Sequence, residues 1–100
     1  MKNKLDINEA DIHQHISSRM KQRGVSKEEI QITLNDGKDA EDCKAGTYGK
    51  VMYFQYQKEW EGIFFEEKEV TVYYKIRDEK LILLTVKARY GSQFKKGGIK

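Results

Sequence analysis

The stretch HQHISSRMKQRGVSKEEI, residues 13–30, contains the end of one helix and the start of another. Ile12, Ile16 and Met20 recur at every fourth residue, which is the spacing of one apolar helix face. This pattern predicts an amphipathic helix over residues 9–23. Gly24 fits the left-handed position that ends many helices, and Val25 follows where a hydrophobic contact often accompanies such a cap.

A second, shorter helix is predicted directly after this glycine. Ser26 and Glu29 have the spacing of a capping box, in which each side chain accepts a hydrogen bond from the other residue's backbone N–H. Ile30 and Leu34 supply the apolar face, and the helix is expected to close at Asp36-Gly37. The first third of the chain is therefore predicted to be a helical hairpin.

Beyond the hairpin the pattern changes from helical to extended. Residues 38–49, KDAEDCKAGTYG, are polar and contain glycine, which predicts a long loop. After it come β-branched and aromatic runs separated by charged turns, and they cover residues 50–57, 61–67, 69–76 and 80–90. These runs predict three or four antiparallel strands. The expected fold class is α+β, a helical hairpin followed by an antiparallel sheet, in a single domain over residues 1–100.

The last two runs also predict how their strands pair. One apolar face is formed by Val70, Val72, Tyr74 and Ile76, and the matching face by Ile82, Leu84, Val86 and Ala88. For these faces to coincide Ile76 must oppose Ile82, which requires an odd-length loop such as residues 78–80. The opposite face would then be basic, and it would carry Tyr73, Lys75, Thr85, Lys87 and Arg89.

The composition excludes several classes of protein. Apolar residues make up 38% of the 100-residue chain and aromatic residues 11%, which favours a folded domain over a disordered one. No apolar run approaches the roughly 18 residues that span a bilayer, and the first residues lack the apolar core of a signal peptide. The single Cys43 cannot form an internal disulfide, which fits a reducing compartment. We therefore expect a cytoplasmic protein without a membrane segment.

Charge is distributed unevenly, although the net charge is only +3. From residue 80 onward there is no Asp or Glu, and the basic residues are Lys80, Lys87, Arg89, Lys95, Lys96 and Lys100. Acidic residues gather instead in residues 36–42 and 59–69. This segregation favours an anion-facing surface, because Lys and Arg near phosphates release counterions. The alternative is a basic tail that serves solubility.

Three potential cations lie at successive i, i+4 positions of the first predicted helix: His15, Arg19 and Arg23. They border its apolar face, where cations lose hydration unless an anion compensates. The anion could be internal, from Asp11 or the acidic loop, and the arginines would then pin the helix by ion pairs. It could instead be a phosphodiester, since histidine suits general acid or base chemistry near neutral pH and arginine stabilises negative charge on phosphorus.

Metal chemistry is not expected. On a helix His13 and His15 would point about 200° apart, so they could not chelate one metal together. The chain has no other set of Cys and His ligands and no paired-carboxylate motif. We therefore expect no cofactor and a metal-independent site.

The helix cluster and the last strand together resemble a known family. His15-Ile16, Arg19-Met20 and Arg23-Gly24-Val25-Ser26, followed by Glu28-Glu29-Ile30, are similar to the N-terminal signature of the domain-of-unknown-function 4258 family. The run LILLTVKARY, residues 81–90, resembles the closing strand of that family. The two motifs frame most of the chain, whereas the middle, YQKEWEGIFFEEKE, matches no motif.

That family resembles, in fold, the metal-independent ribonucleases around barnase, EndoU, the tRNA-cutting colicins and the RelE-type toxins. The resemblance implies a ribonuclease-like toxin or effector, with His15, Arg19 and Thr85 as the positions carried over and Arg23 as a further one. Arg89 and Tyr90 are added from the strand pattern, since RelE-like proteins place basic and tyrosine residues near the C-terminus. One conflict is already visible: if the helices cover the apolar sheet face, Thr85 and Arg89 point away from His15.

Three functions follow from these patterns. The first is a metal-free endoribonuclease toxin that acts on tRNA or mRNA, with His15 as acid or base, Arg19 and Arg89 as electrostatic stabilisers, and a cognate antitoxin or immunity protein as partner. The second is a non-catalytic RNA binder, which would stack bases on Tyr73, Tyr90 and Phe94 and hold phosphates with Lys75, Lys87, Lys95 and Lys96. The third is an interaction module, itself antitoxin-like or immunity-like, whose acidic middle binds a basic protein.

Overall fold

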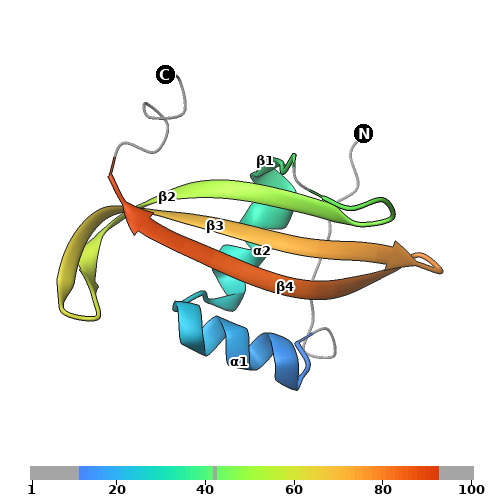
Figure 1. Ribbon diagram of the computed structural model, residues 1–100, viewed down its shortest axis with the longest axis horizontal. Helices are drawn as coiled ribbons and strands as arrows, with labels where there is room; N and C mark the ends of the chain where they lie inside the picture. Colours follow the sequence, from blue (N-terminus) through green and yellow to red (C-terminus); the bar gives the residue numbers. More distant parts are fainter. Residues whose placement is uncertain (1–11, 42, 93–100) are drawn as a thin grey trace.

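Two helices precede a four-stranded antiparallel sheet in the computed structural model of the protein, which describes residues 12–41 and 43–92 (Figure 1). The strand order in the sheet follows the chain, β1-β2-β3-β4. The elements are α1 (Gln14–Arg23), α2 (Lys27–Asp36), β1 (Lys38–Asp39), β2 (Tyr48–Trp60), β3 (Ile63–Arg77) and β4 (Lys80–Gly91). The predicted α+β class, with helices first and sheet second, is confirmed.

Helix α1 ends as predicted but begins later. His13 is its N-cap, with extended backbone angles of φ −81° and ψ 178°, so residues 12 and 13 are not helical. Gly24 ends it in the left-handed region at φ 70°. The backbone N–H groups of Gly24 and Val25 both donate to the Met20 carbonyl, which caps the end of the helix.

Helix α2 begins with the predicted capping box. The Glu29 backbone N–H donates to Ser26 Oγ at 3.1 Å, and the Ser26 N–H donates to Glu29 Oε1 at 3.0 Å. Two of the backbone donors that a helix start leaves without partners are thereby satisfied.

We expect Ser26→Ala to lower the free energy of unfolding by about 1 kcal/mol, because an alanine N-cap offers the Glu29 N–H no acceptor. Chemical denaturation measures the change. Ser18→Ala is the matched control, since Ser18 is an exposed serine within α1, where alanine is well tolerated. Equal stability of the two variants would contradict a stabilising role for this cap.

The sheet differs from the predicted strands in two places. Residues 61–67 and 69–76 are expected to be separate strands, yet β3 is continuous from Ile63 to Arg77, because the lysine at position 68 is buried within the strand. Lys38 and Asp39, expected in the loop, pair with Val51 and Lys50 as the short strand β1.

The pairing of β3 with β4 corrects the predicted register. The connecting turn has two residues, Asp78 and Glu79, both with positive φ, and Ile76 therefore opposes Leu81 rather than Ile82. A β-bulge at Leu84 then shifts the register by one residue. Beyond it the predicted pairs Val72 with Val86 and Val70 with Ala88 form.

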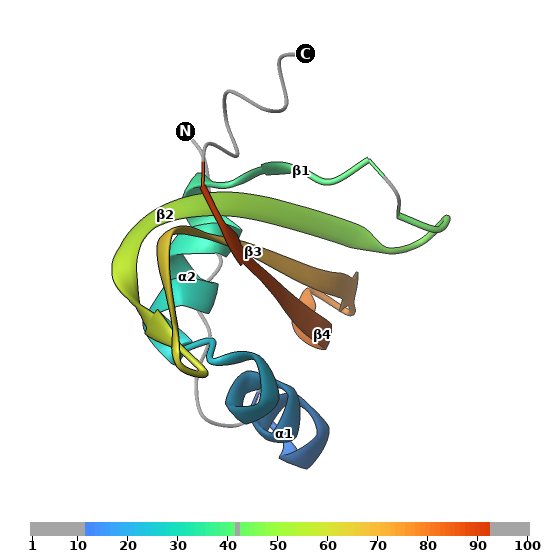
Figure 2. The same cartoon turned by 60° about the vertical axis from the view of Figure 1, so that its left-hand side comes forward.

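Both helices cover the same face of the sheet (Figure 2). The core lies between these layers and consists of Ile16, Val25, Ile30 and Leu34 from the helical segment and Val70, Val72, Tyr74, Leu83 and Val86 from the sheet. The other face, which we call the open face, has no helix over it in the described part of the chain. No helix in this part is long and apolar enough to cross a membrane.

Candidate functional site

The predicted helix cluster lies on the helical layer. His15 is exposed near the start of α1, and Arg19 is half-buried with its Nη1 donating to Gln22 Oε1 at 3.3 Å. The rings of His13 and His15 stack with centroids 6.1 Å apart, because His13 is an extended N-cap. The premise that these two rings point in opposite directions was therefore wrong.

The predicted sheet cluster is divided between the two faces. Tyr73 pairs with Thr85 and Thr71 with Lys87 on the open face, and Lys75 follows Tyr73 by two residues on that face. Arg89 pairs with Glu69 there, whereas Tyr90 points to the helical layer, because neighbouring side chains in a strand alternate. His15, Arg19, Arg23 and Tyr90 thus lie on one side of the sheet and Thr85, Lys87 and Arg89 on the other.

Tyr90 belongs to a contact that joins the sheet to the helical hairpin. Its hydroxyl donates to the Arg23 carbonyl at 2.6 Å, and its ring stacks on Trp60 with centroids 5.1 Å apart. Burial raises the pKa of Tyr90 far above its ordinary value, so its hydroxyl stays protonated as a hydrogen-bond donor. These contacts hold the sheet against the helical hairpin, and they place the Tyr90 side chain on the face opposite to that of Arg89, with which it is grouped in the sequence prediction.

Lys68 lies at the centre of the same contact and is 2% exposed. Its ammonium donates to Glu29 Oε1 at 2.8 Å and also to the Gly24 carbonyl. The rings of Tyr56 and Tyr90 lie 5.4 and 5.5 Å from Lys68 Nζ, at cation–π distance. This buried cation therefore joins the turn between α1 and α2 to the sheet.

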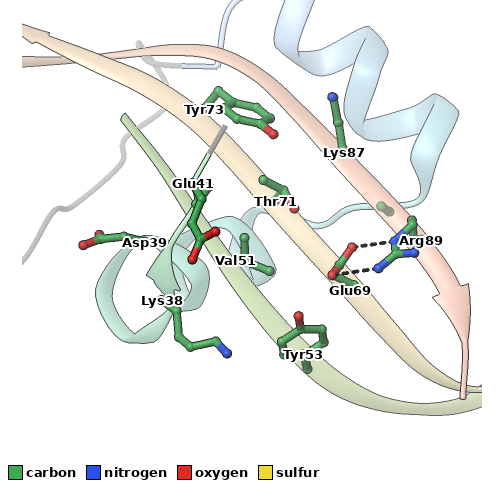
Figure 3. Close-up of a pocket in the computed structure, with 12 residues that line it drawn as sticks. Lys38, Asp39, Glu41, Val51, Tyr53, Glu69, Thr71, Tyr73, Lys87 and Arg89 are labelled. Carbon is green, nitrogen blue, oxygen red and sulfur yellow. Dashed lines mark hydrogen bonds and ion pairs between the residues drawn. The ribbon is translucent and has the colours of Figure 1, made fainter. Parts of the chain in front are cut away.

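The open face contains a hollow of about 500 Å³, shown in Figure 3. Strand β2 contributes Val51 and Tyr53, and the register places them beside Thr71 and Glu69 of β3. Strand β4 contributes Lys87, Ala88 and Arg89, and the segment around β1 contributes Lys38, Asp39, Ala40 and Glu41. Tyr73 completes the lining and lies at the opposite end from Tyr53 in Figure 3.

Each tyrosine of the hollow has a lysine over its ring. Lys38 Nζ lies 5.7 Å from the centroid of Tyr53, and Lys87 Nζ lies 5.2 Å from that of Tyr73. Both lysines are exposed and both tyrosines are half-buried. We call these two contacts the Tyr–Lys pairs. A flat ring beside a mobile ammonium can stack a planar base and bind the phosphate attached to it.

An ion pair lies in the same cross-strand row as Tyr53, which pairs with Glu69 of β3. Arg89 Nε and Nη2 donate to the two carboxylate oxygens of Glu69 at 2.7 and 3.1 Å. The Arg89 side chain is 66% exposed, whereas that of Glu69 is 13% exposed. Hydrogen bonding to Glu69 raises the pKa of Arg89, and desolvation together with the negative charge of Glu69 raises the pKa of Tyr53. Arg89 therefore stays cationic and Tyr53 neutral at physiological pH.

Sequence patterns identified part of this hollow. Tyr73, Lys87 and Arg89 were expected on one basic face, and they line the hollow. Lys38, Tyr53 and Glu69 were missed, because they join it through the pairing of β2 with β1 and β3. In the run KVMYFQYQ, Val51 and Tyr53 are two residues apart and so lie on the same face of a strand. This spacing is the sequence signal that could have placed Tyr53 on the face of the hollow. Lys95, Lys96 and Phe94 lie outside the described residues.

Metal ligands do not gather in the described part of the chain, where no three His, Cys, Asp or Glu side chains are placed to hold an ion. Comparison of the chain with protein-family models, with curated proteins and with solved structures gave no significant match.

Proposed function

We propose that the open face binds single-stranded RNA. The observation that carries the proposal is the pair of tyrosines in the hollow, each with a lysine over its ring. Stacking of a base on an aromatic side chain contributes about 1 to 3 kcal/mol. An antiparallel sheet with one face free of helices offers such rings to bases that are not paired with a second strand.

The hollow is lined by three cationic side chains, Lys38, Lys87 and Arg89, and by three carboxylates, Asp39, Glu41 and Glu69, so binding of an RNA backbone depends on the cations that form no ion pair in the described part of the chain. Two of its carboxylates already have cationic partners, since Glu69 is held by Arg89 and Asp39 accepts from Lys50 Nζ at 2.6 Å. Lys38 and Lys87 contact tyrosine rings and form no ion pair within the described residues. We expect phosphate groups to bind these two lysines, because the contact between an exposed ammonium and an aromatic ring is weak and does not prevent the ammonium from binding phosphate.

Mutation of Lys87 tests this proposal. We expect Lys87→Ala to weaken binding of a labelled single-stranded RNA of about a dozen nucleotides roughly tenfold and to reduce the slope of log Kd against log salt by about 1. Fluorescence anisotropy over a range of salt concentrations measures both. The control is Lys21→Ala, because Lys21 is an exposed lysine of α1. Equal losses for the two variants would mean that the open face has no special role.

Metal-free cleavage of RNA is a second candidate, and the position of Glu69 is the observation that favours it. Its carboxylate lies in the hollow beside Arg89, where it would accept the proton of a ribose 2′-hydroxyl while Arg89 stabilises negative charge on phosphorus. The 2′-oxygen would bond to phosphorus as the bond from phosphorus to the 5′-oxygen breaks, and the leaving 5′-oxygen would take a proton from water, which gives a 2′,3′-cyclic phosphate and a 5′-hydroxyl. His15 lies on the other side of the sheet, so this proposal replaces His15 with Glu69 as the base.

Cleavage is tested on the same RNA in the presence of EDTA. If the hollow cleaves, Glu69→Gln should abolish the products seen on a denaturing gel, and His15→Ala should leave them unchanged. Loss of the products with His15→Ala alone would place the chemistry on α1. Intact RNA with the wild-type protein would leave binding as the activity of the open face.

A further inference from the structure

We infer that the open face holds a short RNA strand at two separate base-stacking subsites, one at each Tyr–Lys pair. The inference rests on the proposed RNA binding and adds the form of the ligand: an extended segment of a few nucleotides that contacts the protein at both ends.

The sheet register fixes the separation of the two subsites. Tyr53 of β2 pairs with Glu69 of β3, and Tyr73 lies four residues farther along the same strand. At about 3.3 Å per residue the two positions are roughly 13 Å apart along the strand direction, and they lie on adjacent strands about 4.8 Å apart. One base cannot contact both rings across this distance.

The floor between the rings offers no third aromatic surface among the residues that line the hollow. Val51 and Thr71 pair there, and Thr71 is 8% exposed. Figure 3 shows Thr71 between Tyr73 at one end and the row of Tyr53, Glu69 and Arg89 at the other. A nucleotide over this floor would meet the Val51 side chain and the Thr71 hydroxyl but no aromatic ring, so it would bind more weakly than the nucleotides at the two ends.

The separation sets the length of the bound strand. Stacked nucleotides advance about 3.4 Å each, so roughly 13 Å corresponds to about four stacked steps, and to fewer in an extended strand. The bound segment is therefore about three to five nucleotides long. A double helix would not fit this arrangement, because its bases are stacked on each other and cannot reach the rings.

The experiment is a length series of single-stranded oligonucleotides from one to eight nucleotides, titrated against the full chain. We expect affinity to rise steeply until the ligand spans both rings at about three to five nucleotides, because linked subsites raise the effective concentration of the second base. Beyond that length it should change little. A blunt duplex of the same sequence should bind at least tenfold more weakly.

Substitutions of Tyr53 and Tyr73 test the subsites. Tyr53→Leu and Tyr73→Leu should each weaken the spanning ligand about tenfold, and their effects should multiply in the double variant, because separate positions more than about 10 Å apart act independently. Tyr48→Leu is the control, since Tyr48 is 54% exposed at the start of β2 but stacks on Tyr74 of the opposite face. Tyr53→Phe and Tyr73→Phe should bind normally, and they provide folded variants if a leucine variant melts early.

The outcomes separate this inference from the proposed function. Affinity that grows evenly with length and does not respond to either tyrosine would overturn the two subsites, while sensitivity to Lys87→Ala would still support RNA binding. If no oligonucleotide of any length binds, the proposed function and the inference both fail.

Discussion

Gly24→Val is expected to lower the free energy of unfolding by about 3 kcal/mol or more, from two separate causes. Gly24 has φ 70°, a backbone conformation that β-branched residues avoid. A Cβ at this position would also lie 2.5 Å from Trp60 Cζ3 and 2.8 Å from the Tyr90 hydroxyl. The hairpin turn and the sheet would have to separate at the point where they meet.

Alanine variants at two glycines divide the effect into its causes. Gly62 has φ 85°, and a Cβ there would project into open space, so Gly62→Ala reports the backbone cost alone, about 1 kcal/mol. Gly24→Ala adds the clash with Trp60 and should cost at least about 1 kcal/mol more. Equal costs in chemical denaturation would mean that the aromatic contact at Gly24 does not constrain the fold.

Lys68→Met is expected to cost about 3 kcal/mol, because it leaves the Glu29 carboxylate and the Gly24 carbonyl without their buried cation. Methionine keeps most of the apolar volume of the lysine side chain, so the loss reports the charge and its hydrogen bonds more than packing. Denaturant titration of the purified variant measures the free energy of unfolding.

A double-mutant cycle with Glu29→Gln isolates the ion pair. Glutamine keeps an oxygen that can accept from the Ser26 N–H, so the capping box is preserved. The double variant should lose at least about 1 kcal/mol less than the sum of the single losses, since both charges are then absent and neither is left without its partner. Glu28→Gln is the matched control, because Glu28 is exposed on the same helical turn. Strict additivity would contradict the coupling.

Local sequence rules predicted the helical hairpin well. The cap at Gly24 and the capping box of Ser26 and Glu29 depend on residues within one or two turns of each other, and both are present. The start of α1 was missed, because the apolar spacing continues through Ile12 while His13 takes an extended conformation. Periodicity identifies a helix face but does not locate a boundary without a capping signal.

The register of the last hairpin could not be obtained from alternation. The run Leu81-Ile82-Leu83-Leu84 is apolar at every position, so it offers an equally apolar face in either register. The positive-φ turn at Asp78-Glu79 pairs Ile76 with Leu81, which is one residue away from the predicted register. The bulge at Leu84 then restores the predicted register for Val86 and Ala88. Glycine and asparagine are the usual signals of a two-residue turn with positive φ, and this turn contains neither. Its length could therefore not be predicted from the sequence.

Only part of the candidate site was predicted, because sequence alternation is local and does not show which strands pair. Tyr73, Lys87 and Arg89 follow from alternation within β3 and β4, which is local. Glu69 and Tyr53 become neighbours of Arg89 only through long-range pairing, and Lys38 does so through a strand of two residues. The resemblance to ribonuclease-like toxins stays a prediction, and its helix and sheet residues do not meet in one site.

The most direct test of the central claim, that the open face binds RNA, is to map the binding surface by NMR. A single-stranded oligonucleotide of about five nucleotides is titrated into the labelled protein, and backbone amide shifts are followed. We predict that the largest shifts fall on the lining of the hollow, at Val51, Tyr53, Thr71, Tyr73 and Lys87, and that α1 changes little. Shifts concentrated on His15, Arg19 and their neighbours in α1, with the hollow unchanged, would contradict the claim.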